Sequence, residues 1–237
     1  MCGRYATTRS TVDLAALFEA IDETGGGLAP DYNVAPTDPV PIVATVKGGR
    51  AIRVARWGLV PAWARDARIG VRMINARAET LMSSNAYAPS FRQRRCLIPA
   101  DGWYEWRPRL LGAGKQAYFM TAEDTMVLAF AGLWSVSATG LVTCSIVTTA
   151  AIRHLVSVHD RMPLLLPAER WGAWLSGPAD PAALLAVPPT KFVDSLEVRP
   201  VGPAVGDVRN DGPGLTARVA MTDTSTSDVQ PTDLTLF

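Results

Sequence analysis

Residues 40–55, Val-Pro-Ile-Val-Ala-Thr-Val-Lys-Gly-Gly-Arg-Ala-Ile-Arg-Val-Ala, carry the clearest structural pattern in the sequence. Two β-rich runs, residues 40–46 and 51–55, flank the segment 47–50, which contains a pair of glycines. Glycine adopts the positive φ angles that hairpin turns need, so a Gly pair between two such runs is typical of a tight turn. The stretch therefore predicts an antiparallel hairpin in a fold that is rich in strands.

The same reasoning applied along the chain predicts further short strands and few helices. Apolar spacing predicts a helix over residues 11–20, with Thr11 as N-cap and the glycines at 25–27 ending it, and a second helix over 169–175. Strands are expected at 116–121, 126–134, 142–148 and 192–198. Strands and helices do not alternate as in a doubly wound fold, so we expect an α+β fold with a mixed, largely antiparallel, barrel-like sheet and peripheral helices.

Composition sets the outer bounds of the chain. Its length suits one large domain, which we place at residues 2–220; residues 221–237 are polar and acidic and predict a disordered tail. No signal peptide is evident near residue 1, and the apolar runs are too short to cross a membrane. We therefore expect a cytoplasmic, nucleoid-associated monomer with no membrane contact.

The basic residues are unevenly distributed. Residues 1–109 hold 15 Lys and Arg against 10 Asp and Glu, whereas residues 110–237 hold 8 against 12. Nearly all the basic residues are Arg, which suits bidentate phosphate contacts, although Arg-rich usage also arises from a GC-rich genome. The asymmetry is compatible with a polyanion partner for the first half.

Three widely spaced cysteines, Cys2, Cys96 and Cys144, argue against a disulfide framework. There is no Cys-x-x-Cys pair, and His154 and His159 would need distant ligands to hold zinc. We expect neither a metal nor another cofactor.

Cys2 becomes the first residue if Met1 is removed, as a small residue at position 2 normally permits. An N-terminal cysteine carries an α-amine of pKa about 8 and a thiol of pKa about 8.5 on adjacent carbons. The amine can form a Schiff base with an aldehyde, and the thiol can then close a five-membered thiazolidine ring. The alternative is an ordinary buried cysteine in a first strand, which is the commoner situation.

Six motifs appear in the sequence in a definite order: Cys-Gly-Arg-Tyr at residues 2–5, Tyr-Asn-Val-Ala-Pro-Thr at 32–37, Met-Ile-Asn-Ala-Arg-Ala-Glu-Thr at 73–80, Arg-Cys-Leu-Ile-Pro-Ala-Asp-Gly-Trp-Tyr-Glu-Trp at 95–106, Val-His-Asp-Arg-Met-Pro at 158–163, and Val-Arg-Asn-Asp-Gly-Pro at 208–213. Together they resemble the SRAP family, the SOS response-associated peptidases, over about residues 2–215. The sequence departs from the family at residues 205–207, where an Asn-rich stretch is usual, and at Trp103, where Phe is commoner.

The resemblance implies an enzyme of DNA repair with lyase-like Schiff-base chemistry. Cys2 would form a thiazolidine DNA–protein crosslink with the ring-opened aldehyde of an abasic site and so shield the lesion. Asn75 would hold the amine and the reacting oxygen, Glu105 would shuttle protons, and His159 would protonate the sugar oxygen, with Thr148 as a supporting hydroxyl. Taken singly, Glu105 could be an exposed strand residue, His159 a surface ion pair and Asn75 a turn residue.

Single-stranded DNA is the partner implied, because a duplex would hide C1′ of the sugar. An abasic site offers no base, so recognition should rest on phosphates and on stacking of neighbouring bases. Residues expected to contact DNA are Arg4, Asn33, Pro36, Trp57, Trp63, Arg77 and Arg161. A core position is an equally good interpretation of Trp57, because it follows a strand.

The chain ends in Asp-Leu-Thr-Leu-Phe, which resembles the peptide that docks bacterial repair proteins on the replication sliding clamp. We hypothesise a clamp contact through Leu234, Leu236 and Phe237; the alternative is an end that packs back on the domain.

Two rival functions remain open at this point. One is an N-terminal-nucleophile cysteine peptidase or amidohydrolase, in which Cys2 attacks an amide, with self-removal of Met1 as related chemistry. The other is a non-covalent single-stranded-DNA binding module with a structural Cys2.

Overall fold

The hairpin of residues 40–55 is part of a closed ring of five strands in the computed structural model, which describes residues 2–109, 113–122, 126–176 and 180–220. Around the ring the strands are β4 (Pro39–Val46), β5 (Gly49–Trp57), β11 (Val142–Ala150), β10 (Leu128–Val136) and β7 (Arg95–Ala100). Neighbours are antiparallel except at the closure, where β5 and β11 run parallel through Arg56–Thr143 and Trp57–Cys144. The predicted hairpin and the barrel-like sheet are both confirmed.

Three short strands extend this sheet. Strand β2 (Ala20–Asp22) runs parallel to β5, β6 (Asn75–Arg77) runs parallel to β11, and β12 (Arg161–Pro163) runs antiparallel to β11. Strand β11 therefore carries β6 and β12 beyond the ring itself.

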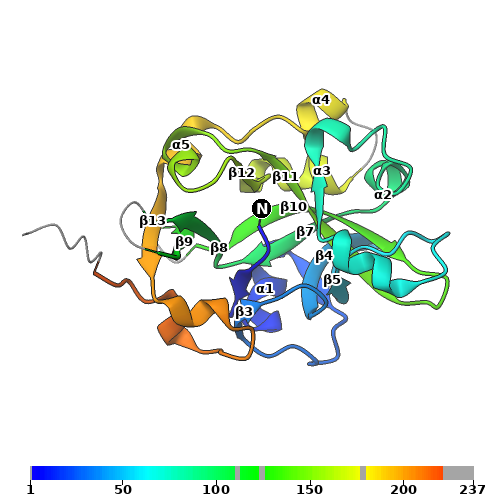
Figure 1. Cartoon of the computed structure of the whole chain (residues 1–237). Helices are drawn as coiled ribbons and strands as arrows, with labels where there is room; N and C mark the ends of the chain where they lie inside the picture. The colour runs from blue at the N-terminus through cyan, green and yellow to red at the C-terminus, as the bar shows by residue number, and fades with distance from the viewer. Residues whose placement is uncertain (1, 110–112, 123–125, 177–179, 221–237) are drawn as a thin grey trace, which may run out of the picture.

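A second sheet of five strands lies against the ring. Its order is β13 (Leu196–Val201), β9 (Lys115–Ala122), β8 (Gly102–Pro108), β1 (Tyr5–Thr7) and β3 (Asp31–Val34), and all its pairings are antiparallel. Figure 1 shows β1, in dark blue, entering near the middle of the molecule. The fold is thus α+β with a largely antiparallel sheet.

Alternation along the strands separates the inner and outer faces of the ring, as a period of two residues requires. Ile42 points into the core shared by the two sheets, whereas Val43 faces outward; Ile98 and Leu97 divide in the same way. Within the inner core the Tyr5 ring meets Trp57 edge-on at 5.2 Å between centroids.

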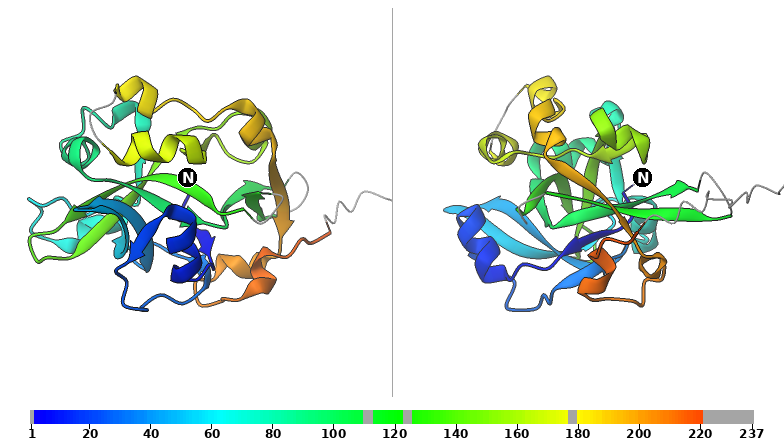
Figure 2. Two further views of the ribbon diagram at one scale, coloured as in Figure 1. Left: turned by 180° about the vertical axis from the view of Figure 1, so that it is seen from behind. Right: turned by 90° about the vertical axis from the view of Figure 1, so that its left-hand side faces the viewer.

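Short helices lie around the outside of the strands (Figures 1 and 2). The α-helices are α1 (Thr11–Phe18), α2 (Ala88–Gln93), α3 (Ala168–Leu175), α4 (Pro181–Leu184) and α5 (Thr190–Asp194). The 3-10 turns are η1 (Ala67–Arg72), η2 (Ala78–Thr80), η3 (Arg153–Ser157), η4 (Pro203–Gly206) and η5 (Pro213–Thr216). Helices α1 to α4 bury apolar side chains against the outer face of the ring, which agrees with the predicted peripheral position.

The structure corrects two local predictions. Helix α1 is capped by Ser10 rather than Thr11, since the Ser10 hydroxyl accepts from the Asp13 amide, and it ends at Phe18 because Glu19 turns into the left-handed region at φ 49°. The late strand begins at Leu196, and Phe192 lies instead in α5, where Pro189 precedes the first turn. β-rich composition concealed a short helix there.

Gly132 of β10 faces the interior of the ring, where neighbouring side chains leave no space for a larger residue. A Cβ atom at this position would come within 2.8 Å of Cys96 Sγ and 2.8 Å of Ile98 Cγ1. By contrast, a Cβ at Gly172 in α3 would meet no atom within 4 Å.

Gly132→Ala should therefore destabilise the domain by about 1–3 kcal/mol, because an added methyl forces strained packing. Gly172→Ala should leave stability unchanged or raise it by up to about 1 kcal/mol through helix propensity. Urea unfolding midpoints of the two variants provide the measurement. Equal stabilities would contradict the close packing inside the ring.

Candidate functional site

Cys2 lies just before β1, in the core shared by the two sheets, and none of its surface is exposed. The pairing of β1 with β8 through Tyr5 and Trp103 fixes its position. Burial raises the pKa of the Cys2 thiol well above its ordinary value, and the negative charge of Glu105 raises it further. The Cys2 thiol is therefore held in its neutral form.

Asn75 connects Cys2 to the ring. It begins β6, where parallel pairing sets it beside Ile146 of β11. Its side-chain Nδ2 donates to the backbone oxygen of Cys2 at 2.7 Å, and the Tyr87 hydroxyl donates to the Asn75 backbone oxygen at 3.0 Å. Asn75 Oδ1 is buried and has no hydrogen-bond partner among the residues that the structure describes, which leaves one acceptor available at Cys2.

Glu105 projects from β8, where it pairs with Tyr118 of β9, and the residue is only 3% exposed. Burial is the main reason that its pKa rises to about 7. A carboxyl group with this pKa exchanges protons near neutral pH, as a general acid or base must. The alternative of an exposed strand residue is excluded by this burial.

His159 lies in the turn between η3 and β12, with its Nε2 4.0 Å from Glu105 Oε2. Its Nδ1 has two neighbours, the Arg161 backbone N–H at 2.9 Å and Asp160 Oδ1 at 2.8 Å. A neutral Nδ1 accepts from the Arg161 amide, whereas a protonated Nδ1 pairs with Asp160. The amide is fixed by the backbone and Asp160 is 85% exposed, so the first arrangement is favoured and the proton then lies on Nε2, toward Glu105.

The two titratable groups have exchanged their usual order of proton affinity. Burial lowers the pKa of His159 below its ordinary 6.5, whereas burial raises that of Glu105 to about 7. At neutral pH the imidazole is neutral, and the carboxyl group is the better holder of a proton. Groups whose environments shift their pKa in opposite directions are typical of acid–base sites.

Thr148 and Arg161 join the two strands that flank this site. Thr148 is buried in β11, opposite Pro163 of β12 and beside Arg77 of β6. The Arg161 guanidinium donates to the Thr148 backbone oxygen at 2.7 Å and forms a bidentate pair with Glu79 at 2.6 and 3.0 Å. The hydrogen bonds from the Arg161 guanidinium lower the pKa of the Glu79 carboxyl group. Arg161 thus braces the turn that holds His159.

Arg4 and Asn33 connect the first strands to the end of the described chain. Arg4 Nη1 donates to Asn33 Oδ1 at 2.6 Å and to the Val205 backbone oxygen at 2.9 Å. Asn33 is buried, and its Nδ2 donates to the backbone oxygens of Asp207 and Asn210. Both side chains are committed to this internal network, which includes residues 205–207, where the sequence departs from the SRAP pattern.

The remaining residues expected at DNA differ in exposure. Arg77 is exposed and Pro36 is half-buried. The Trp63 side chain is 63% exposed, whereas Trp57 has no exposed surface and donates through Nε1 to the Ile74 backbone oxygen. In this conformation Trp57 has no face on which a base could stack, so its role is that of a core residue.

Thr37, next to Pro36, has a φ of 86°. A β-branched residue rarely adopts this left-handed conformation, and such strain tends to gather at functional sites. The Thr37 amide is held there by a bond to the Trp57 backbone oxygen at 2.9 Å.

Sequence reasoning missed two residues that position the site. Glu79 forms an ion pair with Arg161, and its place in the motif at residues 73–80 was the available signal. Tyr87, which binds the backbone of Asn75, lies outside every motif and carried no signal.

The remaining expectations concern a metal site, disulfides, a membrane-spanning segment and the end of the chain. Among the described residues, no three His, Cys, Asp or Glu side chains gather as a metal site would require. All three cysteines are buried and free. In the part of the chain that the structure covers, no helix is long and apolar enough to cross a membrane. Leu234, Leu236 and Phe237, together with the predicted tail, lie outside the described residues.

The site combines a buried cysteine that is hydrogen-bonded to the Asn75 amide, a carboxyl group with a pKa of about 7, and an imidazole. These groups define a candidate site for nucleophilic chemistry with proton transfer. Residues 1–208 match the family described as SOS response associated peptidase (SRAP). The chain belongs to this family.

Relatives and solved structures agree with the assignment. The abasic site processing protein YoqW of Bacillus subtilis is 35% identical over 91% of this chain and 98% of its own. The abasic site processing protein YedK of Escherichia coli is 32% identical, with the same coverage of both chains. A crystal structure from Bacteroides thetaiotaomicron shares the fold, with a TM-score of 0.80 at 23% identity over 92% of this chain and all of that one.

Glu105 should make stability depend on pH in a definite direction. Its pKa in the folded state, about 7, lies above the ordinary 4.5. The folded state holds the Glu105 proton more tightly than the unfolded state does. The stabilisation that results is therefore fully present below about pH 4.5 and is lost as the pH rises through 7. Glu105→Gln should remove this loss, which amounts to about 3 kcal/mol between pH 4 and 8.5. Urea unfolding across that range measures it.

Glu169→Gln, which changes an exposed carboxyl group on α3, provides the matched control and should follow the wild-type pH profile. A Glu105→Gln profile as steep as the wild-type one would contradict the raised pKa.

Proposed function

We propose that the chain, once Met1 is removed, processes abasic sites in single-stranded DNA by forming a covalent thiazolidine with the ring-opened sugar. The observation that carries the proposal is a buried Cys2 whose thiol is near enough to Glu105 for the carboxylate to raise the thiol pKa, while Glu105 itself has a pKa of about 7. The names of the relatives YoqW and YedK, both abasic site processing proteins, support the choice of lesion.

The chemistry begins at the α-amine. Its nitrogen attacks C1′ of the aldehyde, and the proton that it loses passes to the new alkoxide to give a carbinolamine. Protonated Glu105 then donates to the departing hydroxyl, which leaves as water, and the C=N bond forms. The imine formed in this way is protonated. The Sγ–C bond closes next as the C=N π electrons return to nitrogen, and the thiol proton passes to the Glu105 carboxylate, so that Glu105 regains its proton and the net reaction releases one water molecule.

Asn75 would hold the amine in place. Its Nδ2 already binds the Cys2 backbone oxygen, and its Oδ1 is buried without a hydrogen-bond partner among the described residues. An amine N–H donating to Oδ1 would satisfy this buried acceptor and direct the nitrogen lone pair toward the aldehyde. His159, with its proton on Nε2, would donate to the sugar ring oxygen and so assist ring opening.

The raised pKa of the Cys2 thiol favours this order of events over a thiolate attack. Reactive cysteines in peptidases lie in electropositive surroundings that lower the thiol pKa, whereas burial and Glu105 raise that of Cys2. A neutral thiol is well suited to add to a protonated imine as the second step. This observation supports the crosslinking enzyme over the cysteine peptidase.

DNA would reach the site past the exposed Arg77, and Pro36 and the strained Thr37 would be further contacts. Arg77 is exposed and free to meet a phosphate, whereas Arg4 and Asn33 would shape the groove from within. Single-stranded DNA exposes the sugar C1′ that the reaction needs, and neighbouring bases can stack on aromatic side chains such as Trp63.

Mixing the mature protein with single-stranded DNA that carries one abasic site should yield a band that survives denaturation, with a mass equal to protein plus DNA minus one water. Cys2→Ala should abolish the band, because both the thiol and ring closure are lost. Cys144→Ala, which removes another buried thiol, should retain it. Denaturing gels and intact mass spectrometry are the measurements.

Intact mass also shows whether Met1 has been removed. Amide hydrolysis without a crosslink would support the peptidase instead, and binding that denaturation reverses would support the non-covalent module. A stable band from Cys2→Ala equal to that of the wild type would contradict the thiazolidine.

A further inference from the structure

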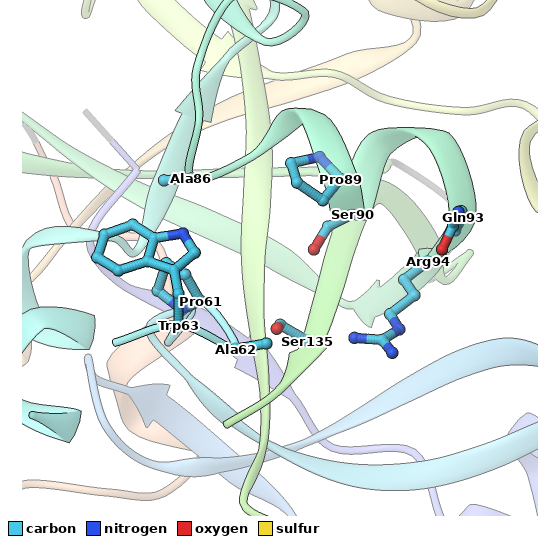
Figure 3. Close-up of a pocket in the computed structure, with 9 residues that line it drawn as sticks. All are labelled: Pro61, Ala62, Trp63, Ala86, Pro89, Ser90, Gln93, Arg94 and Ser135. Carbon is cyan, nitrogen blue, oxygen red and sulfur yellow. The ribbon is translucent and has the colours of Figure 1, made fainter. Parts of the chain in front are cut away.

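A small pocket of about 230 Å³ lies beside Trp63 (Figure 3). It is smaller than the roughly 300 Å³ at which pockets for drug-sized ligands begin, so it suits a single planar ring system. Its lining comes from the segment after β5, from α2 and from the end of β10: Pro61, Ala62, Trp63, Ala86, Pro89, Ser90, Gln93, Arg94 and Ser135.

One wall of the pocket is aromatic. The Trp63 indole is 63% exposed although it is among the largest apolar side chains of the molecule. Figure 3 shows its flat ring on one side of the cavity and Pro89 above. Exposed indoles that border a cavity are well suited to stack on nucleobases, because every base has a π-face.

The opposite wall is polar and fixed in place. The Arg94 backbone oxygen accepts from the Trp134 amide at 2.9 Å, and the Arg94 guanidinium lies 5.5 Å from the centre of the Trp134 ring. These two contacts limit the freedom of a long side chain. The hydroxyls of Ser90 and Ser135, both residues largely buried, lie between Trp63 and Arg94 in Figure 3.

Strand β11 lies between the pocket, which includes Ser135 of β10, and the candidate site, which includes Asn75 of β6. Ser135 of the pocket pairs with Thr143, and Asn75 of the site pairs with Ile146, three residues further along the same strand. Three strand residues span about 10 Å along β11, and the two strand spacings from β10 to β11 and from β11 to β6 add about 5 Å each across it, so the two backbones lie about 14 Å apart. A stacked DNA strand advances about 3.4 Å per nucleotide, so the pocket lies about four nucleotides from the lesion.

We propose that this pocket binds the base of an unpaired nucleotide near the abasic site and prefers guanine. Trp63 stacks on the base, and Arg94 donates to its O6 and N7, the pair of acceptors that guanine alone presents to arginine. The inference rests on the proposed function, since it supplies that function with a sequence preference at one flanking position.

The test uses fluorescent single-stranded DNA with a central tetrahydrofuran, an abasic analogue that lacks the aldehyde and so binds reversibly. In an otherwise all-thymine strand, one guanine is moved through the five positions on each side. Fluorescence anisotropy should show about tenfold tighter binding at one position. In Arg94→Gln this gain should fall below about twofold, while Arg92→Gln, which removes a neighbouring charge outside the pocket, should keep it.

Ala62→Phe, a change at an exposed lining residue, should abolish the guanine gain by filling the cavity without disturbing the core. A gain that is equal at every position, or one that persists in both Arg94→Gln and Ala62→Phe, would overturn the proposal. A parallel reaction with a natural abasic aldehyde separates the two ideas. Crosslinking without a guanine effect refutes the pocket alone, whereas guanine-dependent binding without crosslinking refutes the proposed function alone.

Discussion

The parallel pairing of β6 and β5 with β11 is the constraint on which the rest of the site depends. Through these contacts β11 closes the ring at Cys144 and holds Asn75 beside Ile146. Its far end pairs with β12 and so positions the turn that carries His159. Asn75 in turn holds the backbone of Cys2, which brings the second sheet, with Glu105, against the same strand. A single strand thereby sets the separation of four groups, Cys2, Asn75, Glu105 and His159, that come from distant parts of the sequence.

The groups at the centre of the molecule reduce its stability. A buried Glu105 carries a pKa near 7, Asn75 Oδ1 is buried without a partner among the described residues, and Thr37 has a left-handed backbone. Each of these features costs free energy that the packing around the ring must offset. At Gly132 the side chains of Cys96 and Ile98 leave no room for a Cβ atom, which shows how close that packing is. Rigidity of the ring is what allows the site to keep groups in unfavourable states.

The sequence predicted the hairpin, the main strands and the family because these depend on local alternation and on ordered motifs. It also identified Glu105 and His159, yet their 4.0 Å separation and opposite pKa shifts depend on the pairing of distant strands. Phe192 was misassigned because a short helix that follows a proline has too few residues to show periodicity. Arg4 was expected at DNA from its residue type and position beside Cys2, and Asn33 from a family motif, but only the folded chain shows the backbone oxygens that they bind.

Those bonds from Arg4 and Asn33 also determine when the site can exist. They join residues 201 and 174 positions apart, and the bond from Asn75 to Cys2 spans 73. When residues so far apart in the sequence come together, the chain loses the conformational entropy of a long loop before the contact adds any stability. During synthesis the amino end therefore remains outside any finished core until later strands have emerged. Cys2 is thus among the first residues to be made and among the last to be enclosed.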